Sequence, residues 1–307
     1  MNLNEEEKQI FCEVADVFEV PEGAYNFRVN GKSVGRKSTA NIDIRSKTDV
    51  SGLDIYIKPN TKDETVHIPV AISVAGLKEA VYNDFHIGAG SDVVIIAGCG
   101  IYNCGPVDSV HNGIHRFFVE KGAKVRYVEK HYGFGGGRGS RILNPTTEVY
   151  LDEGAEALLE MEQIKGVDST IRKTNIELKD RAKVVVKERL MTHGRQTAES
   201  IYEVNLDGVN STADIVSRAI AQDFSKQALK MNLIGKLKCR GHSECDAIIM
   251  DNAQVIATPS LNALSIDAEL IHEAAIGKIA GAQITKLMTL GLTKKEAESQ
   301  IINGFLK

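Results

Sequence analysis

The sequence has no tryptophan, few aromatic residues and no long apolar segment. Phe, Trp and Tyr make up 6% of its 307 residues and glycine occurs 27 times, which suits short strands and tight turns better than a helical protein. No apolar run approaches the roughly 20 residues of a membrane span, and the N-terminal MNLNEEEKQIF lacks the basic and apolar regions of a signal peptide. We therefore expect a cytoplasmic protein without a membrane partner.

Positively and negatively charged residues are nearly balanced in number. The 37 Lys and Arg residues stand against 41 Asp and Glu residues, so no nucleic-acid partner is expected, because phosphate contacts need a basic surface. The five cysteines are an odd number in a long chain and predict reduced thiols rather than a disulfide framework. With 43% hydrophobic and 25% charged residues, the composition is that of an ordinary globular protein of one or two domains.

Several familiar catalytic and nucleotide-binding motifs are missing. The sequence contains no H-E-x-x-H or C-x-x-C. The glycine-rich stretch 133–139 has Arg138 where a dinucleotide-binding motif needs its third glycine, and no amphipathic helix follows, so a mobile loop is predicted. The Gly-Lys-Ser at 31–33 resembles the end of a phosphate-binding loop, but Asn26 stands where the first glycine belongs. No nucleotide site is expected in this chain.

Short apolar stretches with strand periodicity fill most of the chain. They extend from about residue 25 to residue 268 and include 53–57 and 184–186. One helix precedes them at 4–15, with Asn4 as its predicted N-cap and an apolar face made of Ile10, Phe11 and Val14. The pattern therefore predicts a mainly β protein with a short N-terminal helix.

A turn that carries a small residue recurs within the β region. Its copies lie at 90–93, 122–125, 154–157, 181–184, 212–215 and 252–255. Their second residues, at 91, 123, 155, 182, 213 and 253, are separated by 32, 32, 27, 31 and 40 residues. Recurrence in this range is typical of a solenoid, in which each coil covers the apolar face of its neighbour. We predict a β-helix; the alternative is a β-sandwich whose turns simply favour small residues.

The end of the chain has helical periodicity. Residues that recur three or four positions apart, as on one face of a helix, are Ile276, Ile279, Gln283, Leu287 and Leu290. Gly291 is the predicted C-cap, and a capping box from Thr293 to Glu296 begins a last helix that ends near Phe305. The predicted organisation is an N-terminal helical segment at 1–20, a β-helix core at 21–268 and a C-terminal helical hairpin at 269–307. The hairpin either packs on the last coil or serves as a docking surface.

Two groups of side chains are candidates for metal chemistry. The first is Cys99-x4-Cys104-x6-His111-x3-His115; on a strand over 110–119, both imidazoles point to one face. The spacing is not that of a zinc finger, and the alternative is that these residues occupy loop or core positions. A zinc-dependent hydrolase or a carbohydrate-acting β-helix enzyme is the corresponding functional alternative, although aromatic residues for a sugar cleft are sparse.

The second group lies near the end of the β region. Cys245 is followed by His272 and Glu273 at the predicted junction of the last strand with the helices. Thiolate, imidazole and carboxylate together bind iron or zinc well. Arg240, His242 or His272 are candidates to lower the pKa of the Cys245 thiol. The alternative is that a lone buried cysteine is an inert small hydrophobic residue.

At these residues the sequence resembles the SufB/SufD family, the scaffold subunits of the SUF iron-sulfur cluster assembly system, and in particular a short SufB-like member. The matching pieces begin at about residue 65 and are Gly98-Cys99, Val110-His111, Glu120–Val125, Cys245-Asp246, His272-Glu273-Ala274, Gly291–Ala297 and Asn303–Phe305. The order and distances of Cys-Asp, His-Glu-Ala and the Gly-Phe tail make the combination specific. The resemblance implies a right-handed parallel β-helix and C-terminal helices that dock the ABC-type ATPase SufC.

The resemblance also implies roles for individual residues. Cys245 matches a sulfur acceptor and cluster ligand of SufB-like members, and Cys99 matches a cysteine that receives sulfur from a donor. Glu273 matches a glutamate implicated in cluster or iron binding, and His272 lies where SufD-like members have a histidine important for assembly. Ile271 replaces a glutamate that some relatives have before this histidine.

We therefore expect a scaffold without turnover chemistry of its own, which accepts sulfur and iron, builds a transient iron-sulfur cluster and passes it to an apo-protein. The expected partners are a SufC-type ATPase, a sulfur donor and acceptor apo-proteins. A homodimer or a SufB/SufD-like heterodimer is expected, with Cys245 of one subunit facing His272 and Glu273 of the other. A cluster-free structural subunit of the SufD type is the alternative, and Cys104 and His115 have no counterpart in the family pattern.

Overall fold

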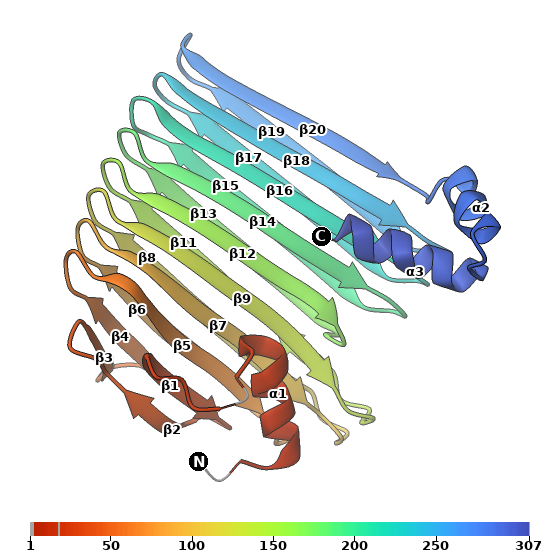
Figure 1. The fold of residues 1–307 in the computed structure, drawn as a ribbon, viewed down its shortest axis with the longest axis horizontal. Coiled ribbons are helices and arrows are strands. Elements are labelled where there is room, and N and C mark those ends of the chain that lie inside the picture. The colour runs from red at the N-terminus through yellow and green to blue at the C-terminus, as the bar shows by residue number, and fades with distance from the viewer. Residues whose placement is uncertain (1–2, 18, 307) are drawn as a thin grey trace.

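Parallel strands wind into a β-solenoid of about eight turns, and strands make up 59% of the chain (Figure 1). The computed structural model describes residues 3–17 and 19–306; parts of the expectations above that fall on residues 1, 2, 18 and 307 lie outside the described residues. Helix α1 (Glu5–Ala15) precedes the solenoid, and α2 (Gly281–Thr289) and α3 (Lys294–Phe305) follow it. The predicted β-helix with a short N-terminal helix and C-terminal helices is confirmed.

Each coil contributes one strand to each of two facing sheets. In spatial order, sheet A contains β2 (Lys32–Lys37), β1 (Ala24–Val29), β5 (Lys62–Ile72), β7 (Asp92–Tyr102), β9 (Lys124–Phe134), β12 (Glu156–Lys165), β14 (Lys183–Thr192), β16 (Ser211–Ala221), β18 (Cys239–Ile249) and β20 (Ala268–Gly277). Sheet B contains β19 (Gln254–Ala263), β17 (Lys226–Gly235), β15 (Thr197–Leu206), β13 (Ser169–Leu178), β10 (Arg141–Leu143) with β11 (Thr146–Leu151), β8 (Ser109–Val119), β6 (Lys78–Ile87), β4 (Gly52–Ile57) and β3 (Ile42–Ser46). Only the β1–β2 and β3–β4 pairs are antiparallel among the described strands.

Alternation along each strand builds the interior. In β8 every second residue from Ser109 to Val119 is buried and the intervening ones are partly exposed. The buried positions of both sheets meet in one long apolar core, whose largest buried side chains include Phe85, Phe117 and Tyr127. Removing this apolar surface from water is the main favourable term in folding, and it requires each coil to cover the next.

The recurring turns follow the coils, with two exceptions. The stretch 212–215 was predicted to be a turn but lies inside β16. The turns at 90–93, 122–125, 154–157 and 181–184 each lead into a strand of sheet A. Successive sheet A strands from β7 to β18 begin at residues 92, 124, 156, 183, 211 and 239, which gives intervals of 32, 32, 27, 28 and 28. The turn at 252–255 leads into β19 of sheet B instead, so its inclusion in the repeat was wrong and produced the interval of 40 residues.

The glycine-rich stretch 133–139 is an ordered, stacked turn, and the prediction of a mobile loop was wrong. The N–H groups of Gly137 and Gly139 donate to the carbonyl oxygens of Asn103 and Gly105 at 3.1 and 3.0 Å. A Cβ added at Gly137 would lie 2.4 Å from the carbonyl oxygen of Gly105. Glycine is therefore required by the close approach of two backbones, rather than by a bound phosphate.

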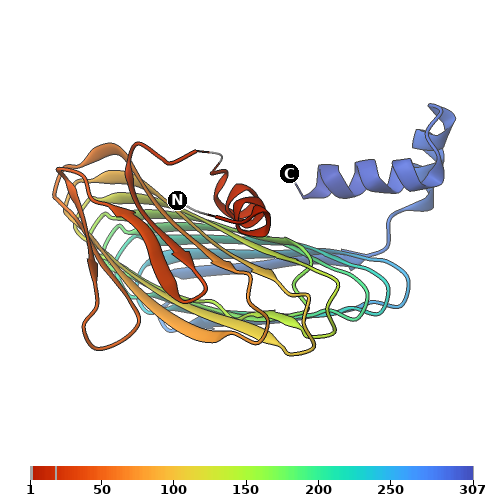
Figure 2. The same ribbon diagram turned by 90° about the horizontal axis from the view of Figure 1, so that it is seen from below.

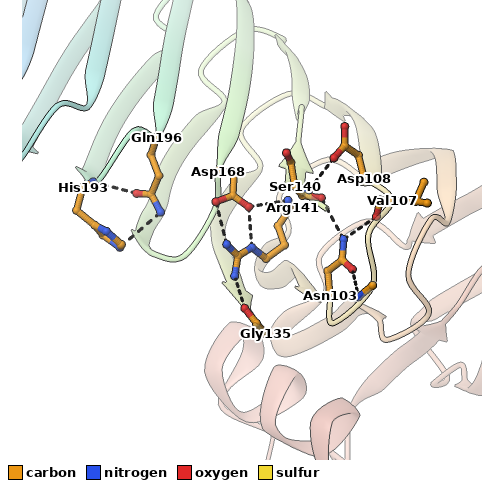
Figure 3. Close-up of polar contacts among 10 residues, drawn as sticks. Asn103, Val107, Asp108, Gly135, Ser140, Arg141, Asp168, His193 and Gln196 are labelled. Carbon is orange, nitrogen blue, oxygen red and sulfur yellow. Dashed lines mark hydrogen bonds and ion pairs between the residues drawn. The ribbon is translucent and has the colours of Figure 1, made fainter. Parts of the chain in front are cut away.

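Side chains tie these turns to the next coils (Figure 3). Arg141 donates to both carboxylate oxygens of Asp168, at 2.7 and 2.8 Å, and to the carbonyl oxygen of Gly135 at 3.0 Å. Asn103 donates to the carbonyl oxygen of Val107 at 2.9 Å. The turns along this edge of the solenoid thus form a continuous hydrogen-bonded stack.

Helix α1 covers the outer face of sheet A near its N-terminal end (Figure 2). The predicted N-cap is confirmed, since Asn4 and Glu7 form a capping box, and Ile10 and Val14 are buried against the sheet. A Cβ at Gly98 would lie 2.5 Å from the Val14 carbonyl oxygen, and a Cβ at Gly100 would lie 2.4 Å from the Ile10 side chain. These two glycines therefore allow the helix to approach the strand.

The C-terminal helices begin later than predicted. Strand β20 continues to Gly277, so the boundary at 268 and the helical periodicity from Ile276 were wrong: these residues extend the parallel sheet. The capping box at the start of α3 is confirmed, and Gly291 follows the C-cap of α2 with φ 94°. Helix α3 lies over the outer face of sheet A, the face that also carries α1 (Figure 2), and encloses a cavity of about 720 Å³. None of the helices among the described residues is long and apolar enough to cross a membrane.

The stacked turns predict that alanine substitutions at two neighbouring glycines have different effects on stability. Gly137→Ala should lower the free energy of unfolding by about 1–3 kcal/mol, because the added methyl group meets backbone atoms. Gly136→Ala is the matched control, since a Cβ there meets nothing within 4 Å, and should change stability by less than about 1 kcal/mol. Urea denaturation followed by circular dichroism measures both, and equal effects would contradict the stacked arrangement.

Candidate functional site

Charged side chains cross the apolar interior of the solenoid. Arg172 extends from β13 of sheet B and forms ion pairs with Glu129 of β9 and, at 3.6 Å, with Glu188 of β14, both in sheet A. A guanidinium nitrogen of Arg172 also lies 3.3 Å from Nδ1 of His131. All four side chains are buried. One guanidinium therefore bridges two carboxylates on alternate coils.

The charges compensate one another in this dry interior. Burial raises the pKa of a carboxyl, but the neighbouring Arg172 guanidinium and His131 outweigh it and hold the pKa of Glu129 well below its usual range. The pKa of Arg172 is correspondingly raised by Glu129 and Glu188, against the effect of burial. Removing one partner of such a group typically costs about 3–5 kcal/mol, because the other charge stays buried.

The charged group connects two cysteines. On the inner face of sheet A, Cys99 is the register neighbour of His131. At the other side, Ser217 donates to Glu188 at 2.7 Å and is the register neighbour of Cys245. We call the series Cys99, His131, Glu129, Arg172, Glu188, Ser217 and Cys245 the interior polar path. Five strand spacings of about 4.8 Å separate the two thiols, or roughly 24 Å, so they cannot react directly with each other.

Both cysteines of the path are closed off from solvent in this structure. Cys99 is 4% exposed, and burial raises the pKa of its thiol well above the usual value. Cys245 is 1% exposed, and burial, followed by the charges of Glu188 and Asp246, raises its pKa to about 11. The lowered pKa expected of the Cys245 thiol is therefore absent.

Cys245, His272 and Glu273 are placed on adjacent strands but not on one face. Cys245 lies in β18 opposite Ala274 of β20, and His272 lies two residues earlier on the same inner face. Glu273 is the register neighbour of Glu244 and lies on the outer face. A single chain thus brings the thiol near His272 and directs Glu273 away from both.

The surroundings of His272 leave one ring nitrogen without a partner. Its Nδ1 lies 2.8 Å from the hydroxyl of Ser243, whereas its buried Nε2 has no hydrogen-bond partner. Burial lowers the pKa of this imidazole, so the ring is neutral and can ligate a metal. Arg240 and His242 are not placed to lower the pKa of the Cys245 thiol, because they lie on the outer face and bond to Glu269 and Asp214.

The coil that carries His272 is the uncovered end of the solenoid. Strands β19 and β20 form the edges of the two sheets and are bonded to another strand on one side only. Most of their side chains are exposed or partly exposed, in contrast to the preceding coil. Large apolar side chains exposed on or beside these strands are Ile256, Leu261, Leu264, Ile266, Ile271 and Ile276. We call β19 and β20 with these side chains the open end.

The first predicted metal group does not assemble. His111 and His115 do share one face of β8, as predicted, but His111 bonds to Glu79 at 3.0 Å and His115 to Tyr127 at 2.7 Å. Cys104 is exposed in the turn after β7. The zinc hydrolase hypothesis therefore has no site among Cys99, Cys104 and these histidines.

One other group of metal-ligating atoms is compact. Within residues 3–17 and 19–306, only Asp54, Asp84 and His86 place three such atoms within 4.8 Å of one another. Asp84 already pairs with Arg116 at 2.7 Å and with Lys47 at 2.9 Å. These cations neutralise the carboxylate, so the group is an ion-pair cluster on the outer face of sheet B.

Sequence reasoning missed the charged members of the interior polar path. Glu129, Arg172 and Glu188 each occupy an inward position of an alternating strand, which is the one available signal. Nothing in the spacing of 43 residues between Glu129 and Arg172 shows that they meet across two sheets. All five cysteines are free thiols, as predicted.

Comparison with known proteins gives one family for most of the chain. A family model described as SUF system FeS cluster assembly, SufBD core domain, matches residues 79–305. An iron-sulfur cluster assembly SufBD family protein of Methanothermobacter thermautotrophicus is 26% identical over 278 residues, which cover 88% of this chain and 66% of that protein. One of Archaeoglobus fulgidus is 30% identical over 264 residues, which cover 84% and 69%. The iron-sulfur cluster assembly protein SufB of Bacillus subtilis is 33% identical over 106 residues, which cover 32% and 22%. The chain thus spans about two thirds of the length of the first two relatives.

The burial of the thiols predicts their order of reaction. Hydrogen bonds from the Tyr102 hydroxyl and the Gly136 N–H lower the pKa of exposed Cys104, whereas burial raises the pKa values of Cys99 and Cys245. Iodoacetamide near neutral pH should therefore alkylate Cys104 first and leave the two buried thiols unmodified until the protein unfolds. Peptide mass spectrometry over a time course measures this, and early alkylation of Cys99 or Cys245 would refute the closed interior.

Proposed function

The chain belongs to the SufB/SufD family of iron-sulfur cluster assembly proteins, and we propose that it is a scaffold on which sulfur and iron are combined into a transient cluster. The observation that carries this proposal is the interior polar path between Cys99 and Cys245, since a structural solenoid has no need for buried charges at this position. The scaffold binds its cargo and releases it to an apo-protein, and it has no turnover chemistry of its own.

Sulfur acceptance is assigned to both ends of the path. Cys99 marks the side where sulfur arrives and Cys245 the side where the cluster forms. The separation of roughly 24 Å requires a small sulfur species to move between them. Hydrosulfide suits this task, because its sulfur has the oxidation level of cluster sulfide and no electron transfer is needed. The buried guanidinium group of Arg172 replaces part of its hydration along the way.

The cluster site is assigned to Cys245, His272 and Glu273. The free Nε2 of His272 supports ligation, and mixed sulfur, nitrogen and oxygen ligands hold a cluster less firmly than four thiolates, which favours release. Metal binding must displace the proton of a Cys245 thiol whose pKa is about 11, so the affinity for iron rises with pH below that value. The bound iron then provides the positive counter-charge that the buried Cys245 thiolate otherwise lacks.

A second subunit completes the site in this proposal. Glu273 lies on the face opposite to Cys245 of its own chain, so a partner's carboxylate or a movement of β20 has to supply the third ligand. The open end supports such a partner, because unpaired strand edges and exposed apolar side chains are typical of association surfaces. Pro259 in β19 is compatible with an edge strand, where the missing N–H breaks no ladder bond. We therefore propose that the chain functions as a homodimer or as part of a SufB/SufD-like heterodimer.

The C-terminal helices are assigned to docking of a SufC-type ABC ATPase. Met288 and Leu290 at the end of α2 are exposed, and Leu290 retains 75% of its accessible surface. The carbonyl oxygen of Phe305 in α3 accepts a hydrogen bond from Arg218 of β16 at 3.4 Å. Helix α3 thus connects the docking surface to sheet A two strands away from β20, and movement of a docked ATPase is transmitted toward the open end. We place this assembly in the cytoplasm, where thiols stay reduced.

A cluster-free structural subunit remains the alternative, and the burial of Cys245 is the observation that favours it. Such a subunit keeps the open end and the helices and lacks a cargo. Analysis of iron, sulfide and zinc in anaerobically purified protein separates the two, because only a scaffold retains iron together with sulfide.

Cys245→Ser should weaken cluster formation. Anaerobic reconstitution with iron and sulfide is expected to give visible absorbance, and the variant should lose at least half of it because serine is a poor iron ligand. Cys239→Ser is the matched control, since Cys239 is also a buried, inward cysteine of β18. Unchanged absorbance in Cys245→Ser would remove this residue from the ligand set.

Replacement of Met288 and Leu290 by Asp should abolish binding of the SufC-type ATPase, because two charges would enter an apolar contact. Val209→Asp, at an exposed valine in a turn of the solenoid, is the control and should bind normally. Size-exclusion chromatography of the mixed proteins measures the complex. Truncation should begin after Gly277, because an earlier cut removes part of β20. Retained binding by the double variant would show that α2 is not the docking surface.

A further inference from the structure

The first coil of the solenoid encloses a polar cavity that the assignments above do not use. It has a volume of about 240 Å³, lies between the β1–β2 hairpin of sheet A and the β3–β4 hairpin of sheet B, and extends from exposed Arg36 and Val50 to buried Val70 and Asn83. A water molecule occupies roughly 30 Å³ in the liquid, so the space accommodates a small polyatomic ion or several waters. We call it the N-terminal cavity.

The wall of the N-terminal cavity carries three cations and no carboxylate. Arg28 pairs with Glu79 at 2.9 Å, and Lys47 pairs with two aspartates outside the lining. Arg36 has no carboxylate among its partners in the described part of the chain; it donates to Asn26 Oδ1 at 2.9 Å and to Ser46 Oγ at 2.8 Å. The charge of Arg36 is therefore available to a ligand.

The neutral groups of the cavity wall leave mostly donors free. Ser46 and Ser51 accept hydrogen bonds from Arg36 and Arg28, so their hydroxyl hydrogens remain available. Asn26 Oδ1 accepts from both Arg36 and Ser33, and its amide nitrogen has no hydrogen-bond partner within residues 3–17 and 19–306, so the amide hydrogens are available as well. A surplus of donors around an unpaired guanidinium is the arrangement that binds an anion.

One acceptor on the floor of the cavity is unsatisfied. Asn83 is 3% exposed, and its Oδ1 has no hydrogen-bond partner. Its amide lies 3.3 Å from His115 Nε2, and the remaining ring nitrogen of His115 bonds to Tyr127, whose own hydroxyl donates to Glu129 at 2.9 Å. Tyr127 therefore accepts from His115 Nδ1–H, His115 Nε2 accepts from the Asn83 amide, and the Asn83 oxygen faces no donor. A ligand that carries a hydrogen satisfies it.

The floor of the cavity lies one coil from Cys99. Val70 is the register neighbour of Cys99, and the two side chains pack in one buried cluster. Neighbouring strands are about 4.8 Å apart, so a single valine side chain separates the cavity from the first thiol of the interior polar path.

We propose that the N-terminal cavity binds a small inorganic anion that carries a hydrogen, that the ligand is hydrosulfide, and that the cavity is the entrance by which sulfur reaches Cys99. Arg36 supplies the charge, Ser46, Ser51 and Asn26 supply donors, and the Asn83 oxygen accepts the S–H hydrogen. Binding itself requires no covalent or redox step. The use of hydrosulfide as a source of cluster sulfur rests on the proposed function.

Binding is tested on metal-free protein under anaerobic conditions. Sodium hydrosulfide is titrated at constant ionic strength with chloride as the balancing anion, and heat of binding and thermal midpoint are recorded. The wild type should bind one equivalent saturably, and Arg36→Gln should bind at least tenfold more weakly. Arg45→Gln is the matched control, because Arg45 in the adjacent strand β3 lies over the outward Tyr56 ring, and it should bind normally. Arg36 is exposed, so its variant should fold; circular dichroism checks this.

The outcomes separate this inference from the proposed function. Absence of saturable binding by the wild type, or equal binding by Arg36→Gln, would overturn the anion site. Binding of bicarbonate or phosphate without binding of hydrosulfide would overturn the choice of ligand. The role of the cavity as a sulfur entrance is tested by the rate of cluster reconstitution. Arg36→Gln should slow reconstitution when sulfide is limiting but not when sulfide is saturating. An unchanged rate at both sulfide concentrations would overturn this role. Iron is absent from the binding experiment, so failure of cluster formation on Cys245 leaves its result unaffected.

Discussion

In-register stacking of parallel strands determines where every functional side chain of this protein lies. Each strand from β5 to β18 bonds to the strand one coil later, so residues 27 to 32 positions apart become neighbours on the same face. The stacking places His131 beside Cys99 and Ser217 beside Cys245, and it allows one arginine from the opposite sheet to serve two carboxylates. A shift of one residue in any coil would turn these side chains outward.

The buried ion group and the buried thiols have the same physical origin. A narrow solenoid interior excludes water, which penalises a thiolate and an isolated carboxylate alike. Arg172 compensates the carboxylates. At Cys99, burial and the nearby carboxylates outweigh the cations Arg172 and Arg28, and at Cys245 burial and carboxylates both raise the thiol pKa, so the thiols stay protonated in this structure. The reactivity of the Cys99 and Cys245 thiols therefore depends on a species that binds beside them. This species can be an anion with its counter-charge, a metal ion or a second subunit.

Local sequence chemistry predicted the elements better than their relations. The N-cap at Asn4 and the capping box at Thr293 were sufficient for the starts of α1 and α3, and the recurring turns were sufficient for the solenoid, because these signals act within a few residues. The sequence could also have predicted that Glu273 lies on the face opposite to His272, because adjacent residues of a strand point to opposite sides. This was missed because residues 272–273 were predicted to lie at a junction rather than inside β20. The meeting of Arg172 with Glu129 depends on coil lengths that vary between 27 and 32 residues, and no local rule supplies these.

The open end has a consequence for the dynamics of the proposed cluster site. In a solenoid, stability is close to a sum of coil and interface terms, and the terminal coil has one interface where the middle coils have two. Strands β19 and β20 are therefore expected to detach at a lower free energy than the middle coils, and His272 and Glu273 would move with them. Peeling of this single coil would uncover the Cys245 thiol while the coils that hold Arg172 stay folded, so the proposed loading and unloading of cargo would need no global unfolding.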